Sequence, residues 1–427
     1  MDRTIPRGGA EAAPQPPPYR PVESGESVVH LATVLRVLMY SGLAIILLGT
    51  ALALVRHGNL PTPVTNVTAL PGQLAGLHSD AILSLGILIF LCSPAAALAY
   101  LTVSYLLARN RLYTVIAAVV LAIVLGSIVV ARYSGAGAGV ESGPELTLAR
   151  EAAIFLLSLS GGILGSMVGI GGGIFMVPVL TAFVGIPIKT AIAASAVSVI
   201  VNSIGGSSVY LQHKLTNVRL ALFMELTTAV GAIAGGLLVV YIAGNPLRVI
   251  FALALVGMGL AMLRQQKQQA PATSGDDPLR LAQVFHDPVD QADVVYIPQR
   301  LPLGAVAGFL AGVISGLLGI GGGAIKIPIM NALMRVPVKA AAATSILMVG
   351  ITVSASAFIY YIHDLIDLSV TIPAVLGILI GSQTGAAVSR HLKSVTLVRV
   401  LVLIVVYLAI NLLLQALGIR LPGTSGS

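Results

Sequence analysis

Two glycine clusters of the same sequence, Gly169-Ile-Gly-Gly-Gly173 and Gly319-Ile-Gly-Gly-Gly323, lie 150 residues apart in the chain. Glycine inside a helix costs about 1 kcal/mol relative to alanine, so each cluster is expected to break the helix that contains it. Such a break would free backbone N–H groups at the start of the apolar segments 174–184 and 324–334. Because the positive end of a helix dipole lies behind these groups, they would favour an anion.

A second interpretation of the clusters is purely structural. Small residues at a spacing of four let two helices approach closely, and Gly161, Gly165 and Gly169 have this spacing. A dinucleotide-binding loop is a poor match, because the G-x-G-x-x-G frame fails at Ile174 and Ala324. We favour backbone anion binding over packing alone, since a duplicated cluster exceeds what close packing requires.

Two ionisable residues stand within apolar segments. Lys326 follows the second cluster, at a position where the first half has Met176. A lysine at membrane depth costs about 2.5–3.5 kcal/mol, so it is expected either to complete an anion site inside the protein or to snorkel to the membrane surface. Glu225, in the apolar run 218–242, has three interpretations: pairing with Lys326, proton uptake for coupling, or placement at the membrane surface.

Uncharged polar residues in the neighbouring apolar runs complete the candidate site. Individually, such residues most often hydrogen-bond to a neighbouring helix, but a duplicated set beside the glycine clusters would suit an oxyanion. The predicted substrate-binding residues are Gly171, Gly172, Gly173, Ser195, Asn202, Gly321, Gly322, Gly323, Lys326, Thr344, Ser345 and Gln383, with Glu225 as the candidate for proton coupling. We predict no catalytic residue, no metal site and no cofactor.

The elements that position these residues are expected to be membrane-spanning helices. The chain is 56% hydrophobic and only 9% charged, with a mean hydropathy of +0.96, which excludes an ordinary soluble protein. A helix needs about 20 apolar residues to cross a membrane. Eleven runs of this length are found near 31–55, 80–108, 111–131, 148–168, 188–211, 218–242, 246–263, 301–320, 338–361, 370–388 and 395–416.

The predicted fold is an all-α polytopic membrane protein of about eleven transmembrane helices, eight of which form two duplicated four-helix repeats with glycine-broken helices. Aligned at the 150-residue offset, 15 of the 49 positions from 165 to 213 are identical to positions 315–363. The sequence leaves open whether the repeats are parallel or inverted. The predicted regions are a disordered tail (1–30), a three-span accessory domain (31–131), repeat 1 (148–263), a polar linker (264–300) and repeat 2 (301–416).

The charged residues bear on partners and orientation. The formal net charge is +8, but the 24 Lys and Arg are scattered without a basic run, so we expect contact with lipid headgroups and no nucleic-acid binding. Counting Lys and Arg on alternate sides of eleven spans places the N-terminus in the cytoplasm by a narrow margin. The expected partners are a small anionic substrate, the lipid bilayer and further copies of the chain in a homo-oligomer.

The paired glycine motifs ending in Val177-Pro178 and Ile327-Pro328, the pairs Ala194-Ser195 and Thr344-Ser345, and Gly381-Ser-Gln-Thr-Gly385 resemble the TauE/SafE family of sulfite-exporter-like permeases. The resemblance covers roughly 150–416. It implies eight spans that move small sulfur-containing anions, such as sulfite, sulfonates or thiosulfate, across the bacterial inner membrane. The chain departs from the family at Ala194, where Thr is usual, and at Lys326, where an apolar residue is common. Residues 31–131, with Ser93-Pro94 and Arg109-Asn-Arg-Leu-Tyr113, resemble a three-span membrane domain of unknown function.

The sequence therefore predicts a secondary transporter for a sulfur oxyanion, in which one repeat moves against the other. The alternatives are an anion channel and a non-transporting, anion-sensing membrane protein. An enzyme is not expected: Gly205-Gly-Ser-Ser-Val209 misses the G-x-S-x-G frame, and Ser207 and His213 lie on different faces of a helix.

Overall fold

The computed structural model describes residues 25–58, 60–61, 69–135, 147–168, 172–264, 272, 276–287, 292–389 and 394–418. Each predicted apolar run coincides with a long helix. These helices are α1 Gly25–His57, α3 Ser79–Leu107, α4 Arg111–Tyr133, α5 Leu148–Val168, α7 Ile188–Gln212, α8 Val218–Tyr241, α9 Gly244–Arg264, α10 Leu301–Leu318, α12 Val338–Ile362, α13 Leu368–Ser389 and α14 Ser394–Ala416. Among the described residues, nine helices are long and apolar enough to cross a membrane. The all-α polytopic fold is confirmed.

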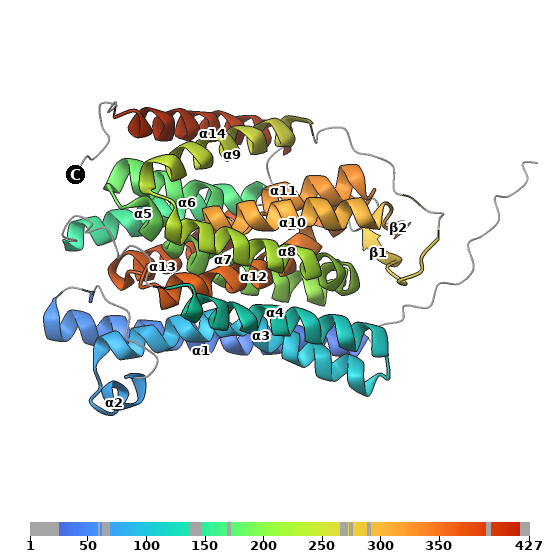
Figure 1. The fold of residues 1–427 in the computed structure, drawn as a ribbon, viewed down its shortest axis with the longest axis horizontal. Helices are drawn as coiled ribbons and strands as arrows, with labels where there is room; N and C mark the ends of the chain where they lie inside the picture. The colour runs from blue at the N-terminus through green and yellow to red at the C-terminus, as the bar shows by residue number, and fades with distance from the viewer. Residues whose placement is uncertain are drawn as a thin grey trace, which may run out of the picture.

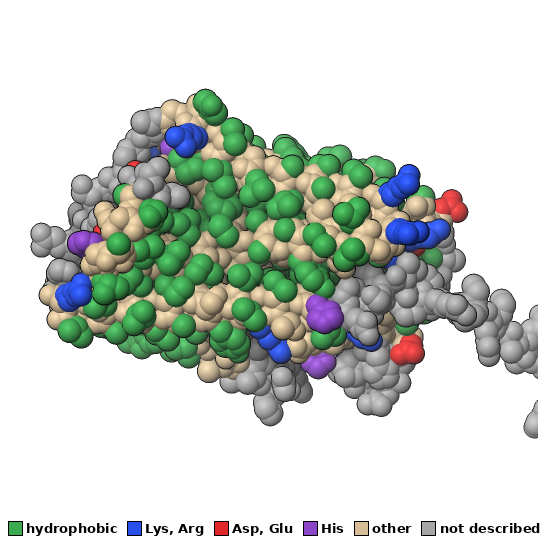
Figure 2. Space-filling model, turned by 90° about the horizontal axis from the view of Figure 1, so that it is seen from below, with side chains coloured by type: hydrophobic (Ala, Val, Ile, Leu, Met, Phe, Trp, Pro, Cys, Tyr) green, Lys and Arg blue, Asp and Glu red, His purple; other side chains and the backbone are tan. Residues whose placement is uncertain are grey.

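The helices lie side by side in layers. In Figure 1, α1, α3 and α4 form a layer on one side of the bundle, α9 and α14 lie on the opposite side, and α7, α8, α12 and α13 run between them. The short helix α2, Leu70–Ala75, follows α1. Figure 2 shows one outer face, on which hydrophobic side chains cover the middle and Lys, Arg, Asp, Glu and His gather toward the two ends. A band of this kind matches a hydrocarbon layer between two aqueous phases.

The two ends of the bundle are distinct. One end, the β end, carries the antiparallel strands β1, Gln283–Asp287, and β2, Ala292–Tyr296, which pair from Gln283↔Tyr296 to Asp287↔Ala292. The sequence did not predict this pair of strands within the polar linker. Asn217, before α8, donates to Leu281 O at 2.8 Å and so lies at the β end. At the other end of α8, Tyr241 donates to Ser134 O, and this is the far end.

The structure contains two hairpins, named here the broken helices, and the second glycine cluster lies at the tip of the second hairpin. The first joins α5 to α6, Gly173–Val179, and the π-helical turn η1, Leu180–Val184; the second joins α10 to α11, Gly323–Pro328, and η2, Ile329–Leu333. Gln299, before α10, donates its N–H to Met334 O at 2.9 Å, so the chain returns to the end at which it entered. In the first broken helix, a Cβ built on Gly161 of α5 would lie 3.6 Å from Phe175 Cβ of α6, whereas 14 residues of straight helix would span about 21 Å. Helix α6 therefore lies back against α5.

The broken helices enter the bundle from opposite ends. The second starts directly after β2, at the β end. The first starts at the far end, where Glu151 accepts from the N–H of Leu60, a residue that follows α1. The beginning of α1 is at the β end, because Arg36 donates to Gln212 at 2.6 Å. The two halves of the region 148–416 therefore run in opposite directions, which the sequence had left open.

Glycine-mediated contacts interlock the two halves. Helix α10 packs on α8, where a Cβ on Gly312 would lie 2.1 Å from Thr228 O, and α5 packs on α13, where a Cβ on Gly162 would lie 2.8 Å from Ile378 O. Gly161, which belongs to the predicted packing stripe, makes only an ordinary contact. Because α10 belongs to one half and α8 to the other, residues 148–263 cannot move as a rigid unit against 301–416 without opening these contacts. The predicted motion of one repeat against the other does not fit this arrangement.

The layer of α1, α3 and α4, named here the accessory layer, is fixed to the middle of the bundle. Helix α1 packs on α7, and α4 packs on α8 and α12. Ser354 of α12 donates to Leu91 O of α3 at 2.6 Å. Helix α1 begins at Gly25, inside the segment predicted as a tail, and residues 1–24 lie outside the described part of the chain.

Candidate functional site

The second glycine cluster unwinds the backbone. Helix α10 ends at Leu318, and Gly319, Gly321 and Gly322 have positive φ values of 64°, 79° and 67°. Only glycine adopts this conformation without steric cost, which explains why the cluster consists of glycine. Gly172 has φ 75° in the first cluster, whereas Gly169, Ile170 and Gly171 lie outside the described residues. The predicted break is therefore confirmed for the second broken helix.

The tips of the two broken helices meet. A Cβ on Gly173 would lie 3.0 Å from Ile320 Cα and 2.5 Å from a methyl group of Val199. A Cβ on Gly321 would lie 2.8 Å from Val199 and 2.5 Å from Val349, the residue at the 150-residue offset from Val199. The described glycines thus agree with both interpretations: those of the second cluster unwind the helix, and Gly173 and Gly321 leave room for close packing at the tips.

Ser195 fastens the two tips together. Its hydroxyl is fully buried and can donate to Gly319 O at 3.0 Å and to Gly173 O at 3.4 Å. Ser345, at the corresponding position of α12, is also buried, and its hydroxyl has no hydrogen-bond partner among the described residues. The residue that corresponds to Gly319 is Gly169, which is not described. The predicted pair of serines therefore lies beside the broken helices, with Ser195 already bonded to backbone.

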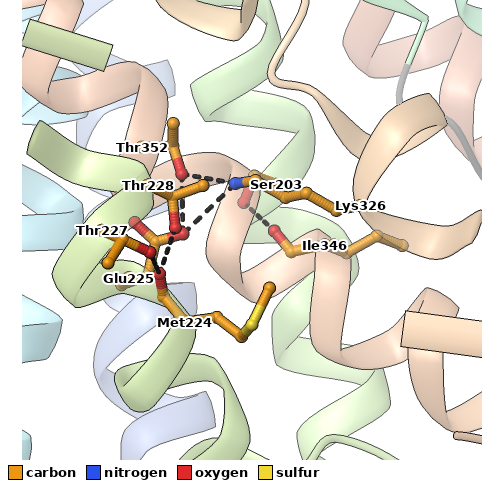
Figure 3. A network of polar contacts seen from close by, with 8 residues as sticks. All are labelled: Ser203, Met224, Glu225, Thr227, Thr228, Lys326, Ile346 and Thr352. Carbon is orange, nitrogen blue, oxygen red and sulfur yellow. Dashed lines mark hydrogen bonds and ion pairs between the residues drawn. The ribbon is translucent and has the colours of Figure 1, made fainter. Parts of the chain in front are cut away.

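A buried polar network lies next to the second tip (Figure 3). Lys326 of α11 donates to Glu225 of α8 at 3.2 Å and to the hydroxyl of Thr352 of α12 at 2.5 Å. The Thr352 hydroxyl donates in turn to the same Glu225 oxygen, Oε1, at 2.6 Å. All three side chains are fully buried. Of the interpretations weighed for these two residues, the structure thus has Lys326 paired with Glu225, and it places neither of them at the membrane surface.

The network leaves one polar atom unpaired. Glu225 Oε2 is buried and accepts no hydrogen bond from any described residue. A buried carboxylate oxygen normally has a partner, because removing it from water is costly. The ion pair is neutral overall, which is the form in which two buried charges are tolerated.

None of the other predicted residues that the structure describes takes part in the hydrogen bonds of this network. The Thr344 hydroxyl accepts from Asn217 N at 2.9 Å, at the β end of α12 and about 12 Å along the helix axis from Thr352. Asn202 is half-buried on α7, and Gln383 is exposed on α13. Gly322 and Gly323 are buried within the second tip. Thr344 therefore holds the connection before α8, and Gln383 faces away from the interior.

Thr352 is the member of the network that the predicted set missed. The sequence did contain a signal, because Thr352 occupies the position that corresponds to Asn202 at the 150-residue offset. The positions that correspond to Lys326 and Glu225 are Met176 and Val375. The charged pair thus joins the two halves and has no counterpart at the corresponding positions. Among the described residues, no group of three His, Cys, Asp or Glu side chains could hold a metal ion.

Comparison with known proteins agrees with this architecture. Residues 31–129 match the model of a protein of unknown function, DUF1634. A probable membrane transporter protein, YunE of Bacillus subtilis, is 23% identical over 271 residues, covering 62% of this chain and 97% of the relative. Probable membrane transporter proteins of Xylella fastidiosa and Methanocaldococcus jannaschii are 29% and 28% identical, over 59% and 54% of this chain and 91% and 85% of the relatives.

No solved structure is significantly similar to the chain. Residues 154–412 match the model named sulfite exporter TauE/SafE, which covers more than half of the sequence. The two family models match separate parts of the chain, so the structure joins two units that carry separate family descriptions. The chain is a membrane transporter with an N-terminal DUF1634 region, and it belongs to the TauE/SafE family.

Proposed function

We propose that this transporter moves a small sulfur-containing oxyanion, of the sulfite, sulfonate or thiosulfate class, as a secondary transporter. The observation that carries the proposal is the meeting of two glycine-broken helices beside a buried lysine. Unwound backbone within a membrane protein is tolerated where it is buried in protein or lines a pathway. Half-helix ends at the middle of the membrane are a recurrent way to hold an anionic group.

We assign the substrate contacts to the backbone of Gly171 to Gly173 and Gly321 to Gly323, with Lys326 as the cation. Ser195 would hold the two tips in register, and Ser345, whose hydroxyl is unpaired among the described residues, is a better candidate for contacting the anion. The remaining predicted ligands, Asn202, Thr344 and Gln383, carry less support from the geometry described above.

The motion that gives access to the site would involve the broken helices. They are the elements with hinges, because glycine has the largest conformational freedom. The middle helices α7, α8 and α12 are held by the accessory layer. We therefore propose that α7, α8 and α12 form the fixed part, with α10 packed on α8, and that the segments after the glycine clusters, α6 with η1 and α11 with η2, shift against it to open the site to each side in turn.

The distribution of charge supports an orientation with the N-terminus in the cytoplasm of a bacterium and the chain in the inner membrane. Nine described Lys and Arg lie at the β end: Arg36, Arg109, Arg111, Lys214, Arg219, Arg280, Arg300, Arg335 and Lys339. Five lie at the far end: Arg56, Arg132, Arg150, Lys189 and Arg248. Because positive residues accumulate on the cytoplasmic side, the β end and the start of α1 would face the cytoplasm. Homo-oligomerisation remains a prediction, which light scattering of the purified protein would measure.

The function can be tested with the full chain in proteoliposomes. Uptake of 35S-labelled sulfite, thiosulfate and methanesulfonate would be measured against empty vesicles, with chloride as the competing anion. Saturable uptake of at least one sulfur anion, lost in Gly321→Val, is the expected result. Step-like single-channel currents would instead identify an anion channel. Tight binding of the anions without any flux would identify a sensor.

A further inference from the structure

The Lys326–Glu225 pair is isolated from other charges. Among the described residues, the only charged group that acts on Glu225 is Lys326, and the only one that acts on Lys326 is Glu225. The other side chains beside the carboxylate are the hydroxyls of Thr352 and Thr228. A change in the charge of one partner can therefore be balanced only by the other.

The pair also joins a hinged segment to the fixed part of the bundle. Lys326 lies on α11, directly after the backbone that Gly319, Gly321 and Gly322 unwind. Glu225 and Thr352 lie on α8 and α12, on which α4 of the accessory layer packs. A shift of α11 about these glycines would draw the ammonium group away from the carboxylate.

Binding of an anion at Lys326 would have the same consequence for charge. The ammonium group would then be paired with the anion, and Glu225 would lose its counter-charge while fully buried. A buried, unpaired carboxylate is strongly unfavourable, and such a group takes up a proton instead. Glu225 Oε2, which has no partner among the described residues, offers the position for that proton, while Oε1 keeps the hydrogen bond from Thr352.

We propose that each anion that binds at Lys326 enters together with one proton that binds Glu225, so that anion and proton cross the membrane in the same direction. This inference rests on the proposed function for the identity of the anion. The proton comes from water on the side of entry and forms an O–H bond at Glu225. On the other side both leave, and the Lys326–Glu225 contact forms again. No electrons are transferred, and a monovalent anion adds no net charge to the site.

The stoichiometry of one proton distinguishes substrates by charge. Methanesulfonate is monovalent, so its movement with one proton would be independent of the membrane potential. Thiosulfate is divalent, so its movement with one proton would carry one negative charge. At zero potential, a gradient of one pH unit should concentrate methanesulfonate about tenfold inside the vesicles.

The first half of the region supplies matched substitutions, because Met176 and Val375 occupy the positions that correspond to Lys326 and Glu225. The double variant Lys326→Met/Glu225→Val removes both charges at once and leaves no charge unpaired, so it is expected to fold. Glu225→Gln keeps the shape of the side chain and removes only the proton site. Glu151→Gln is the control, since Glu151 is a buried carboxylate at the far end that contacts Leu60 and lies outside the network.

The experiment measures anion uptake and internal pH together in proteoliposomes of the full chain, with the potential clamped by potassium and valinomycin. Wild type and Glu151→Gln should accumulate methanesulfonate about tenfold per pH unit and acidify the lumen as they do so. Glu225→Gln should equilibrate the anion without accumulation, whereas the double variant, which lacks the cation at the anion site, should take up little methanesulfonate and acidify the lumen no faster than empty vesicles. Methanesulfonate flux in the wild type without proton movement, or pH-driven accumulation in Glu225→Gln, would overturn the inference.

A second measurement separates this inference from the identity of the substrate. Infrared spectroscopy of Lys326→Met should show the absorption of a protonated carboxyl group that is missing in Lys326→Met/Glu225→Gln. An ionised Glu225 in Lys326→Met would refute the charge balance. If no sulfur anion is transported while the protonated carboxyl is observed, the proposed substrate class fails and the charge balance stands.

Discussion

Replacing Gly312 by alanine tests how closely α10 and α8 must approach. A Cβ at this position would lie 2.1 Å from Thr228 O, whereas ordinary contact begins at 3.4 Å. The two helices would have to separate by about 1.3 Å, the difference between these distances. The obstructing atom belongs to the backbone, so no change of side-chain rotamer relieves the overlap.

Two opposing effects set the magnitude. Alanine stabilises a helix by about 1 kcal/mol relative to glycine. Overpacking of a core costs about 1–3 kcal/mol, and occasionally more. Because the overlap is with backbone, we expect the upper part of this range, and a net loss of about 2 kcal/mol. Thr228 lies one helical turn from Glu225, so the displacement should also weaken the ion pair.

Thermal unfolding in detergent, followed by circular dichroism, would measure the effect. The matched control is Gly257→Ala on α9, where nothing lies within 4 Å of the built Cβ, and this variant should be as stable as wild type or slightly more stable. Gly162→Ala, with a separation of 2.8 Å from Ile378 O, should fall between the two. If Gly312→Ala unfolds at the wild-type temperature, the close approach of α8 and α10 is not required and the reasoning is wrong.

Three further predictions concern single side chains. Ser195→Ala should destabilise the protein by about 1 kcal/mol, because its hydrogen bonds to the glycine carbonyls are lost, whereas Ser345→Ala should be nearly neutral. Equal effects of the two substitutions in thermal unfolding would contradict the different roles of the two serines. Lys326→Met should lower the free energy of unfolding by about 3–5 kcal/mol at neutral pH, and adding Glu225→Val should restore most of this loss. If the double variant is no more stable than the single one, the two side chains are not energetically coupled. Burial lowers the pKa of His363, at the end of α12, so the unfolded chain binds its proton more readily and stability should decline as pH falls below about 6.5. His363→Gln should flatten this acid response in unfolding experiments at several pH values, and an unchanged response would assign it to other groups.

The eleven long helices were predictable because a hydrocarbon layer requires long apolar segments, although two of them, α5 and α10, belong to hairpins and are not simple crossings. The glycine breaks were predictable because glycine adopts the left-handed conformations found at Gly319 and Gly321 without steric cost, and a dense glycine cluster disfavours a continuous helix. The direction of the broken helices was not predictable, because a hairpin that returns and a helix that crosses have the same local sequence. Their direction is set by distant contacts, such as that between Gln299 and Met334.

The candidate site was predicted in part. A charged lysine or glutamate inside an apolar helix has a high free-energy cost unless it is paired, and a pair of Lys326 with Glu225 was one of the predicted arrangements. Threonine and serine carry no such cost, because they can bond to the carbonyl group of the preceding turn, as Thr228 does with Met224. The roles of Thr352 and Thr344 therefore depend on which helix faces them. The strands β1 and β2 were missed because their apolar runs, such as Val294-Val295-Tyr296, are short and lie within a polar linker.

The buried ion pair has a consequence for how the chain is made. Glu225 and Lys326 are 101 residues apart in the sequence. At about 5–20 residues per second, the ribosome makes Glu225 roughly 5–20 s before it makes Lys326. During this interval the carboxylate has no counter-charge, so α8 must wait with Glu225 protonated, in water or at the insertion machinery. Helix α8 can therefore pack into the core only after the second broken helix has been synthesised. Truncation of the chain before Lys326 should leave α8 exposed to quality-control proteases.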